Sequence, residues 1–365
     1  MLFQFVIALL ITSTSAKTEF FGKADSDDVH ANIRFEFELN VEIGTPSKTF
    51  KLAIDLQSDE SWIYAVSCRT CHSHWNINHY DYLSSKTFKN VSTLFSKTYS
   101  SESYNKTSIV NGYVANDEFQ FSREPAGRYN FNLITQLKDE DMTEDAYGDH
   151  HSGLAGFGFP SNGDTKWIGN IAFKGEKKVI CLGNYGDGLA FRSFGGFPSF
   201  HHQNLSSLAV TTSSGKWTVK IGGQQYGRVR IGRPTDVAIS TLTPYIHVSK
   251  AIFSAVMREL IPDNQNGEKV VDCAKNATAL PLRIQAGDVW LDVEPKRYLR
   301  KIKGSENKCL LLIKQSKLDT ELTFGTSFLD DHPICVNYDQ KLLHFLKVIP
   351  VIRTTTAKPK IEFGI

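Results

Sequence analysis

The sequence predicts an all-β protein of two lobes, and three observations lead to this prediction. Its 365 residues are too many for one hydrophobic core and suit two units of roughly 150 residues each. Short segments alternate apolar and polar residues with a period of two and end at glycine-rich turns, which is typical of β-strands. One arrangement of turns also occurs twice in the same order, which indicates two related lobes.

The amino terminus has the layout of a secretory signal peptide. Residues 2–11 form a short apolar run and small residues follow up to Ala16, although the usual leading basic residue is absent. We expect residues 1–16 to be removed and residues 17–34 to form an N-terminal segment; a buried helix or strand is the alternative. No later segment approaches the roughly 18 apolar residues of a membrane span. The mature protein is therefore expected outside the cell or in the secretory or endolysosomal lumen.

The first lobe is expected to span residues 35–205. Residues 35–43 alternate apolar and polar side chains, which predicts a strand, and Gly-Thr-Pro at 44–46 predicts the turn that ends it. A second strand follows from Phe50. A weak helical pattern lies near residues 165–173.

The second lobe is expected to span residues 206–348. Residues 217–221 repeat the alternation and end at two glycines. The strongest helical pattern of the chain runs from Ser249 to Leu260. Residues 349–365 are expected to form an exposed tail.

The charge composition excludes some partners. The chain has 41 basic and 39 acidic residues, a net charge of +2, and no basic stripe, which argues against binding to nucleic acid. The histidine pairs at 150–151 and 201–202 are candidate metal ligands. The side chains of adjacent residues point in different directions, however, so neither pair is expected to hold one ion. We expect no metal and no cofactor.

An even number of cysteines predicts three disulfides in an oxidising compartment and leaves the pairing open. The cysteines are Cys68, Cys71, Cys181, Cys273, Cys309 and Cys335. The Cys-Arg-Thr-Cys stretch at 68–71, with histidines nearby, also fits a zinc site or a redox pair. Neither a full ligand set nor a helix amino terminus is visible there, so a small disulfide loop is favoured.

Four glycosylation sequons agree with a secretory route. They begin at Asn90, Asn105, Asn204 and Asn276. Together with the signal peptide they predict a secreted glycoprotein.

Two polar turns follow apolar strands at corresponding places in the two halves. Residues 50–58 place Asp55 directly after one strand, and residues 237–243 place Ser240 directly after the other. A glycine-bearing segment follows each turn later in its half, at residues 153–158 and 322–325. We expect the two turns to meet at the interface of the lobes.

These motifs resemble the pepsin-like aspartic proteases over nearly the whole mature chain. The match opens with Val-Glu-Ile-Gly-Thr-Pro at 41–46, then Asp55, Ser58 and Trp62, and residues 152–159 resemble the family's Asp-Gly-Ile-Leu-Gly-Leu-Gly segment. Further matches follow in family order at Phe194-Gly195-Gly196, Trp217, Pro281, Phe328-Leu329 and Tyr338-Asp339. Residues 335–339 are most similar to nematode members.

The resemblance implies a bilobal fold of two six-stranded, barrel-like lobes with a cleft between them. It also implies the disulfides Cys68–Cys71 and Cys273–Cys309, which leaves Cys181 to pair with Cys335.

A working member of this family needs two carboxyl groups that share one proton, because like charges this close do not both ionise. Here Asp55 is present, but Ser240 stands where the second aspartate is expected. A serine hydroxyl has no useful acidity, and losing one acid or base partner costs roughly 10²- to 10⁴-fold in rate. Asp55 is therefore expected to be a residual, buried turn residue with a raised pKa, hydrogen-bonded to Ser58 or Ser240.

The residues around both positions also depart from the family pattern. Leu56 and Gln57 replace the threonine and glycine of the first turn, and Leu242 replaces the glycine of the second. Tyr104 is the candidate for the tyrosine of the flap that covers the cleft, with a solvent-facing strand residue as the alternative. The expected cleft residues are Leu56, Gln57, Ser58, Tyr104, Thr241, Leu242 and Thr243, with Leu56, Gln57, Leu242 and Pro244 crowding the floor.

The sequence thus predicts a secreted pepsin-like protein that has lost peptidase activity and binds a peptide, a protein or an apolar ligand. The first alternative is an aspartic endopeptidase with unorthodox catalytic residues. The second is a structural secreted glycoprotein.

Overall fold

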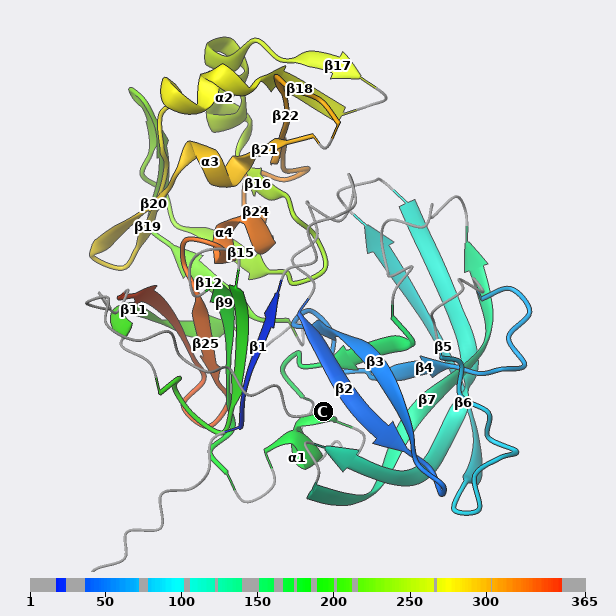
Figure 1. Cartoon of the computed structure of the whole chain (residues 1–365). Helices are drawn as coiled ribbons and strands as arrows, with labels where there is room; N and C mark the ends of the chain where they lie inside the picture. Colours follow the sequence, from blue (N-terminus) through cyan, green and yellow to red (C-terminus); the bar gives the residue numbers. More distant parts are fainter. Residues whose placement is uncertain are drawn as a thin grey trace, which may run out of the picture.

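The fold is described from a computed structural model and is built almost entirely of β-strands (Figure 1). The structure describes residues 18–23, 37–71, 78–101, 106–121, 124–139, 151–160, 167–173, 176–184, 189–199, 202–211, 216–265, 268–302 and 304–349. Most strands belong to two large sheets, and two four-stranded sheets complete the described part of the chain. The predicted mainly β fold is confirmed.

A seven-stranded sheet forms the first lobe. Its strands in order are β2 (Glu38–Ile43), β3 (Lys48–Asp55), β8 (Gly153–Gly156), β4 (Trp62–Tyr64), β7 (Glu124–Asp139), β6 (Lys106–Phe121) and β5 (Lys89–Ser101). Strand β2 also pairs with β6, so the sheet curls round and closes on itself. The alternation expected at residues 35–43 is present, since Leu39, Val41 and Ile43 are buried.

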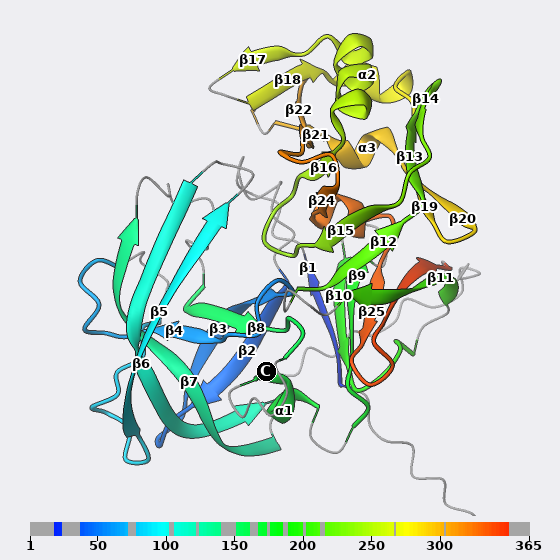
Figure 2. The same ribbon diagram turned by 180° about the vertical axis from the view of Figure 1, so that it is seen from behind.

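An eleven-stranded sheet lies between the two lobes. Its strands in order are β1 (Thr18–Lys23), β10 (Leu189–Phe194), β9 (Val179–Asn184), β25 (Ile334–Asn337), β26 (Leu342–Val348), β11 (His202–Thr211), β12 (Thr218–Ile221), β15 (Thr235–Ile239), β24 (Glu321–Phe324), β16 (Ile246–Val248) and β23 (Ile313–Gln315). Figures 1 and 2 show β1, β9 and β25 close together near the middle of the molecule. This sheet combines strands from both halves of the sequence.

The second lobe adds two small sheets and most of the helical residues. One sheet has the order β14 (Val229–Ile231), β13 (Gly223–Tyr226), β19 (Leu282–Ala286) and β20 (Val289–Val293), and the other β17 (Asp263–Gln265), β18 (Glu268–Asp272), β22 (Lys308–Leu311) and β21 (Leu299–Lys301). The helices are α1 (Gly169–Ala172), α2 (Lys250–Leu260), α3 (Pro295–Tyr298), α4 (Thr326–Leu329) and the 3₁₀ helix η2 (Cys273–Ala277).

Helix α2 is the helix that the sequence predicts best. Ser249 precedes it in an extended conformation, and Ile261 ends it in the left-handed region. Its buried residues are Ile252, Ala255, Val256 and Leu260, a spacing that places them on one face. Within residues 167–173, the described part of the weak helical pattern, the short helix α1 is present.

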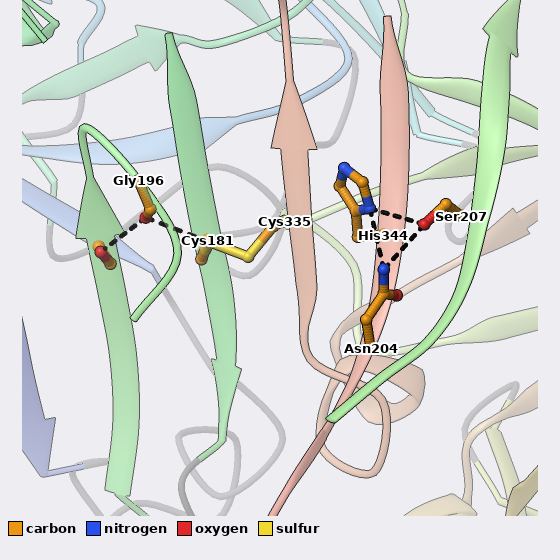
Figure 3. The surroundings of a disulfide bond; sticks show 7 residues. Cys181, Gly196, Asn204, Ser207, Cys335 and His344 are labelled. Atoms are coloured by element: carbon orange, nitrogen blue, oxygen red, sulfur yellow. Dashed lines mark hydrogen bonds between the residues drawn. A yellow bond between two sulfur atoms is a disulfide. The ribbon is translucent and has the colours of Figure 1, made fainter. Parts of the chain in front are cut away.

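The six cysteines form three disulfides, in the pairs that the resemblance and elimination imply. They are Cys68–Cys71, Cys181–Cys335 and Cys273–Cys309. Because Cys68 and Cys71 are bonded to each other, neither thiolate is available as a zinc ligand in this structure. An oxidised redox pair has the same bond, so the redox alternative stays a prediction. Cys181 lies opposite Cys335 in the antiparallel β9–β25 pair, as Figure 3 shows.

Figure 3 also shows a polar cluster beside that disulfide. Ser207 Oγ lies 2.7 Å from His344 Nδ1, and the amide of Asn204 donates to Ser207 Oγ at 2.9 Å. The sequon at Asn204 is therefore on an exposed strand but uses its amide nitrogen in a local hydrogen bond. Within the described ranges, no helix is long and apolar enough to cross a membrane.

Two glycines permit close backbone contacts behind the polar turns. A Cβ atom on Gly325 would lie 2.2 Å from the carbonyl oxygen of Thr243 and 2.6 Å from that of Tyr245. On Gly156 it would lie 2.5 Å from the carbonyl oxygen of Glu60. Neither position has room for a larger residue without moving the backbone.

We expect Gly325→Ala to lower the free energy of unfolding by about 2 to 3 kcal/mol, because the added methyl group overpacks a backbone contact. Urea denaturation followed by circular dichroism measures the change. Gly232→Ala is the matched control, since a Cβ atom there meets nothing within 4 Å, and its effect should stay below about 0.5 kcal/mol. Equal midpoints for the two variants would contradict the prediction.

Candidate functional site

The first polar turn is held by the central strands of the first lobe. Strand β3 ends at Asp55, which lies opposite Gly156 in the parallel β3–β8 pair. The Asp55 side chain is 2% exposed, and its Oδ1 accepts the backbone N–H of Gln57 at 2.7 Å. This bond takes the place of the expected bond to Ser58 or Ser240.

The second turn has the same hydrogen-bond pattern. The backbone N–H of Ser240 donates to the carbonyl of Phe324 at 2.9 Å, and Ser240 Oγ accepts the N–H of Leu242 at 3.3 Å. In each turn the side chain accepts from the residue two positions later. Ser240 therefore occupies in its turn the place that Asp55 occupies in the first.

A second pair of residues repeats the correspondence. Ser58 Oγ accepts the N–H of Glu60 at 3.2 Å, and Thr243 Oγ1 accepts the N–H of Tyr245 at 3.3 Å. Both bonds again span two positions. The internal repeat that the sequence indicates thus extends to individual hydrogen bonds.

The two turns meet, as the sequence predicts. The Thr241 hydroxyl donates to the carbonyl of Ile54, the residue before Asp55, at 2.5 Å, and both groups are buried. The symmetric bond from the first turn would need a hydroxyl at position 56. Leu56 has no hydroxyl, so its side chain makes no hydrogen bond to the second turn that would match the Thr241–Ile54 bond. The backbone N–H of Trp217 donates to the Leu56 carbonyl at 3.3 Å.

The apolar replacements lie in different places. Leu56 is completely buried in the main core. Its predicted place at the floor of a cleft stays a prediction. Leu242 is half-buried and packs against a second cluster that includes Trp62 and Tyr99. Gln57 is half-buried and Pro244 is buried.

A tyrosine that sequence reasoning missed lies over the first turn. Trp62 Nε1 donates to the Tyr99 hydroxyl at 2.8 Å, and Tyr99 belongs to β5 of the β5–β6 hairpin. The proposed flap residue Tyr104 lies outside the described residues. The signal that points to Tyr99 is the pair of small residues after it, Ser100 and Ser101, where the family pattern has Gly-Thr.

Lys97, two residues before Tyr99, was also missed. Its ammonium group donates to Ser58 Oγ at 2.7 Å and lies 5.7 Å from the centre of the Tyr99 ring. Lysines are common on strand surfaces, so nothing in the sequence alone places this one beside Asp55.

The electrostatic surroundings of Asp55 are mixed. The pKa of the carboxyl is raised to about 6 by the balance of these groups: burial is the largest cause and raises it, the Gln57 N–H, Lys97 and Lys216 lower it, and Asp59 raises it slightly. Burial dominates. Among the described residues, no group of three His, Cys, Asp or Glu side chains lies close enough together to hold a metal ion.

This pKa shift makes a prediction about stability. In the unfolded chain Asp55 loses its proton near pH 4, and in the folded chain near pH 6, so the folded state binds more protons in that window. The contribution of Asp55 to the free energy of unfolding therefore falls as the pH rises from 4 to 6. A shift of two units corresponds to about 3 kcal/mol.

Asp55→Asn keeps an oxygen for the Gln57 N–H and removes the ionisable group. Relative to the wild type, we expect the variant to gain about 3 kcal/mol between pH 4 and pH 7 in urea denaturation. The exposed Asp288→Asn is the control and should show no such trend. A pH-independent difference for Asp55→Asn would refute the burial argument.

Comparison with known proteins identifies the fold family. The model of the eukaryotic aspartyl protease family matches residues 36–348. The chain is 23% identical over 278 residues to a probable vacuolar protease A of Arthroderma benhamiae, covering 73% of this chain and 66% of the relative. It is 22% identical over 287 residues to renin of Echis ocellatus, covering 74% and 68%.

A third relative, rhizopuspepsin of Rhizopus chinensis, is 25% identical over 250 residues, covering 65% of this chain and 60% of the relative. The chain thus spans about two thirds of the length of the curated relatives it matches. Because the family match covers most of the chain and the paired turns have the geometry described above, the protein belongs to the eukaryotic aspartyl protease family.

Proposed function

We propose that this chain is a secreted pseudoprotease that binds a peptide, a protein or an apolar ligand between its two lobes. The observation that supports this proposal most directly is the position of Ser240. Its hydroxyl takes, in the second turn, the same hydrogen-bonding role that the Asp55 carboxyl has in the first. The resemblance calls for a carboxyl at both positions, and here only the first has one.

The chemistry of the family depends on both carboxyl groups. One must be ionised to take a proton from water while the other stays protonated to polarise the substrate carbonyl, and each holds the other in its protonation state. A serine hydroxyl neither ionises near neutral pH nor delivers an acidic proton. Asp55 in this site therefore has no acidic partner in the second turn, and peptide hydrolysis by the family mechanism is not supported.

The active alternative, an aspartic endopeptidase with unorthodox residues, is favoured by specific contacts. The Thr241–Ile54 bond still links the turns, and Trp62 still bonds to a tyrosine of the hairpin. Two of the relatives carry names of proteases or pepsins. These features concern the backbone arrangement of the site. The absence of the second carboxyl concerns the groups that would react with the substrate, and inactivity is therefore the stronger proposal.

Secretion, glycosylation and the division into lobes belong to the same proposal. Removal of residues 1–16, glycans at the four sequons, and lobes at 35–205 and 206–348 are what the sequence supports. A structural secreted glycoprotein without a ligand is the remaining alternative. The sequons at Asn90 and Asn204 are exposed, which suits a glycoprotein of either kind.

A peptidase assay tests the proposal. The purified glycoprotein is incubated with a peptide library from pH 3 to pH 7, with and without pepstatin, and products are followed by mass spectrometry. We expect no pepstatin-sensitive cleavage. Cleavage that pepstatin blocks and that Asp55→Asn abolishes would overturn the pseudoprotease and establish the endopeptidase.

Ser240→Asp is the sharper test of how far the site has diverged. We expect this single change to restore no measurable turnover, because Leu56 still removes one link between the turns and Leu242 still occupies a glycine position. Circular dichroism confirms folding of the variant. Pepstatin-sensitive turnover by Ser240→Asp alone would show that the missing carboxyl is the only defect.

A further inference from the structure

The first of the four sequons lies on an edge strand of the first lobe. Strand β5 is the last strand in the order of the seven-stranded sheet, and β6 is its only neighbour there among the described strands. The outer side of β5 therefore has backbone N–H and C=O groups that no described strand pairs with. Such an edge can pair with a strand of a second molecule, and proteins usually protect it with charges, with proline or with a covering segment.

The segment around this sequon has none of the usual protective residues. Residues 90–96 read Asn-Val-Ser-Thr-Leu-Phe-Ser, with no charged residue, no proline and no glycine. Two of its apolar side chains face solvent, since Val91 is 44% exposed and Leu94 is 89% exposed. The next charged residue, Lys97, donates a hydrogen bond to Ser58 Oγ instead of guarding the edge. An uncharged strand segment of this composition is an aggregation hazard at an exposed edge.

A bulge brings the sequon asparagine close to the more exposed leucine. Asn90 lies opposite Ala115 of β6 and Leu94 lies opposite Tyr113, so four steps along β5 correspond to two steps along β6. Residues directly opposite each other share a face of the sheet, and so do residues two apart on one strand. The side chains of Asn90 and Leu94 therefore lie on one face, about 7 Å apart along the strand direction.

The conformation of the bulge leaves the amide nitrogen of Asn90 available. Asn90 Oδ1 accepts the backbone N–H of Ser92 at 2.6 Å, and Ser92 is in the left-handed region with a φ of 60°. The oxygen is thus engaged, whereas Nδ2, the atom that carries an N-linked glycan, makes no hydrogen bond to a described residue. The sequon at Asn204 differs, because its Nδ2 donates to Ser207 Oγ. Asn105 lies outside the described residues.

We propose that a glycan at Asn90 covers the exposed bulge of β5 and keeps this edge from pairing with a second copy of the chain. An N-linked glycan is bulky and solubilising. On the face that holds Leu94 it excludes a partner strand by its volume and shields the leucine from apolar contacts. This role rests on the glycosylation proposed above. It involves no chemical step, so it holds for an inactive and for an active protein alike.

Removal of the glycan tests this role. Wild type and Asn90→Gln are secreted from a glycosylating host, and glycopeptide mass spectrometry establishes which asparagines carry glycans. Sedimentation velocity is then measured from about 1 to about 100 µM, the range in which exposed strand edges promote association. We expect the wild type to carry the Asn90 glycan and to stay monomeric. Asn90→Gln should associate at a concentration at least about tenfold lower, because burial of one leucine side chain favours association by this factor or more.

Two further variants show whether the association uses this edge. Leu94→Lys, added to Asn90→Gln, places a charge on the same face and should restore the monomer although the glycan is absent. Asn276→Gln removes a sequon on the helix η2, outside the first-lobe sheet, and should behave as the wild type. If Asn90→Gln alone is not secreted in folded form, the double variant still carries the test, because it should be secreted, folded and monomeric.

The role is overturned by any of five results. They are an unmodified Asn90 in the wild type, a monomeric Asn90→Gln, association that persists after Leu94→Lys, equal association of Asn276→Gln, and a double variant that does not fold. An unmodified Asn90 would contradict the proposed glycosylation as well. A monomeric Asn90→Gln beside a glycosylated wild type would contradict only the role at the edge. Pepstatin-sensitive cleavage would overturn the pseudoprotease and leave all these results unchanged.

Discussion

The site depends on the close approach of two backbone turns, one from each half of the chain. Thr241 reaches the carbonyl next to Asp55, and Gly156 and Gly325 leave space for the strands that support each turn from behind. A buried polar group in this position must find a partner, because an unpaired one costs about 1 to 3 kcal/mol. This one contact depends on three features: the strands that lead to the turns, the glycines behind the turns, and the sheet between the lobes.

The two turns share one pattern of backbone hydrogen bonds although their side chains differ. Hydrogen bonds that fix the backbone are retained in both turns, including those made by side chains at Ser58 and Thr243. The group that differs, Ser240, still accepts the same backbone N–H as a carboxylate would. A serine thus fills the same hydrogen-bonding role in this turn, so the local backbone arrangement does not require a carboxyl group at position 240.

Much of this frame could be predicted from the sequence, since it rests on local patterns. Period-two alternation identified the strand at Leu39 to Ile43, the spacing of apolar residues identified α2, and the two strand ends located Asp55 and Ser240. The burial of Leu56, the position of Tyr99 and the contact of Lys97 could not be predicted. The places of Tyr99 and Lys97 depend on which strand faces which turn across some 40 residues of chain, and strand register of that kind is set by tertiary packing. The burial of Leu56 depends on packing in the main core.

The Cys181–Cys335 disulfide has a topological consequence. It joins residues 154 positions apart and closes a covalent ring around nearly all of the second lobe, and the Cys273–Cys309 bridge lies within that ring. A single cut by a proteolytic enzyme between residues 182 and 334 opens the ring but leaves both pieces attached to one molecule. The pieces of the second lobe thus stay covalently joined even where one of its loops is cut.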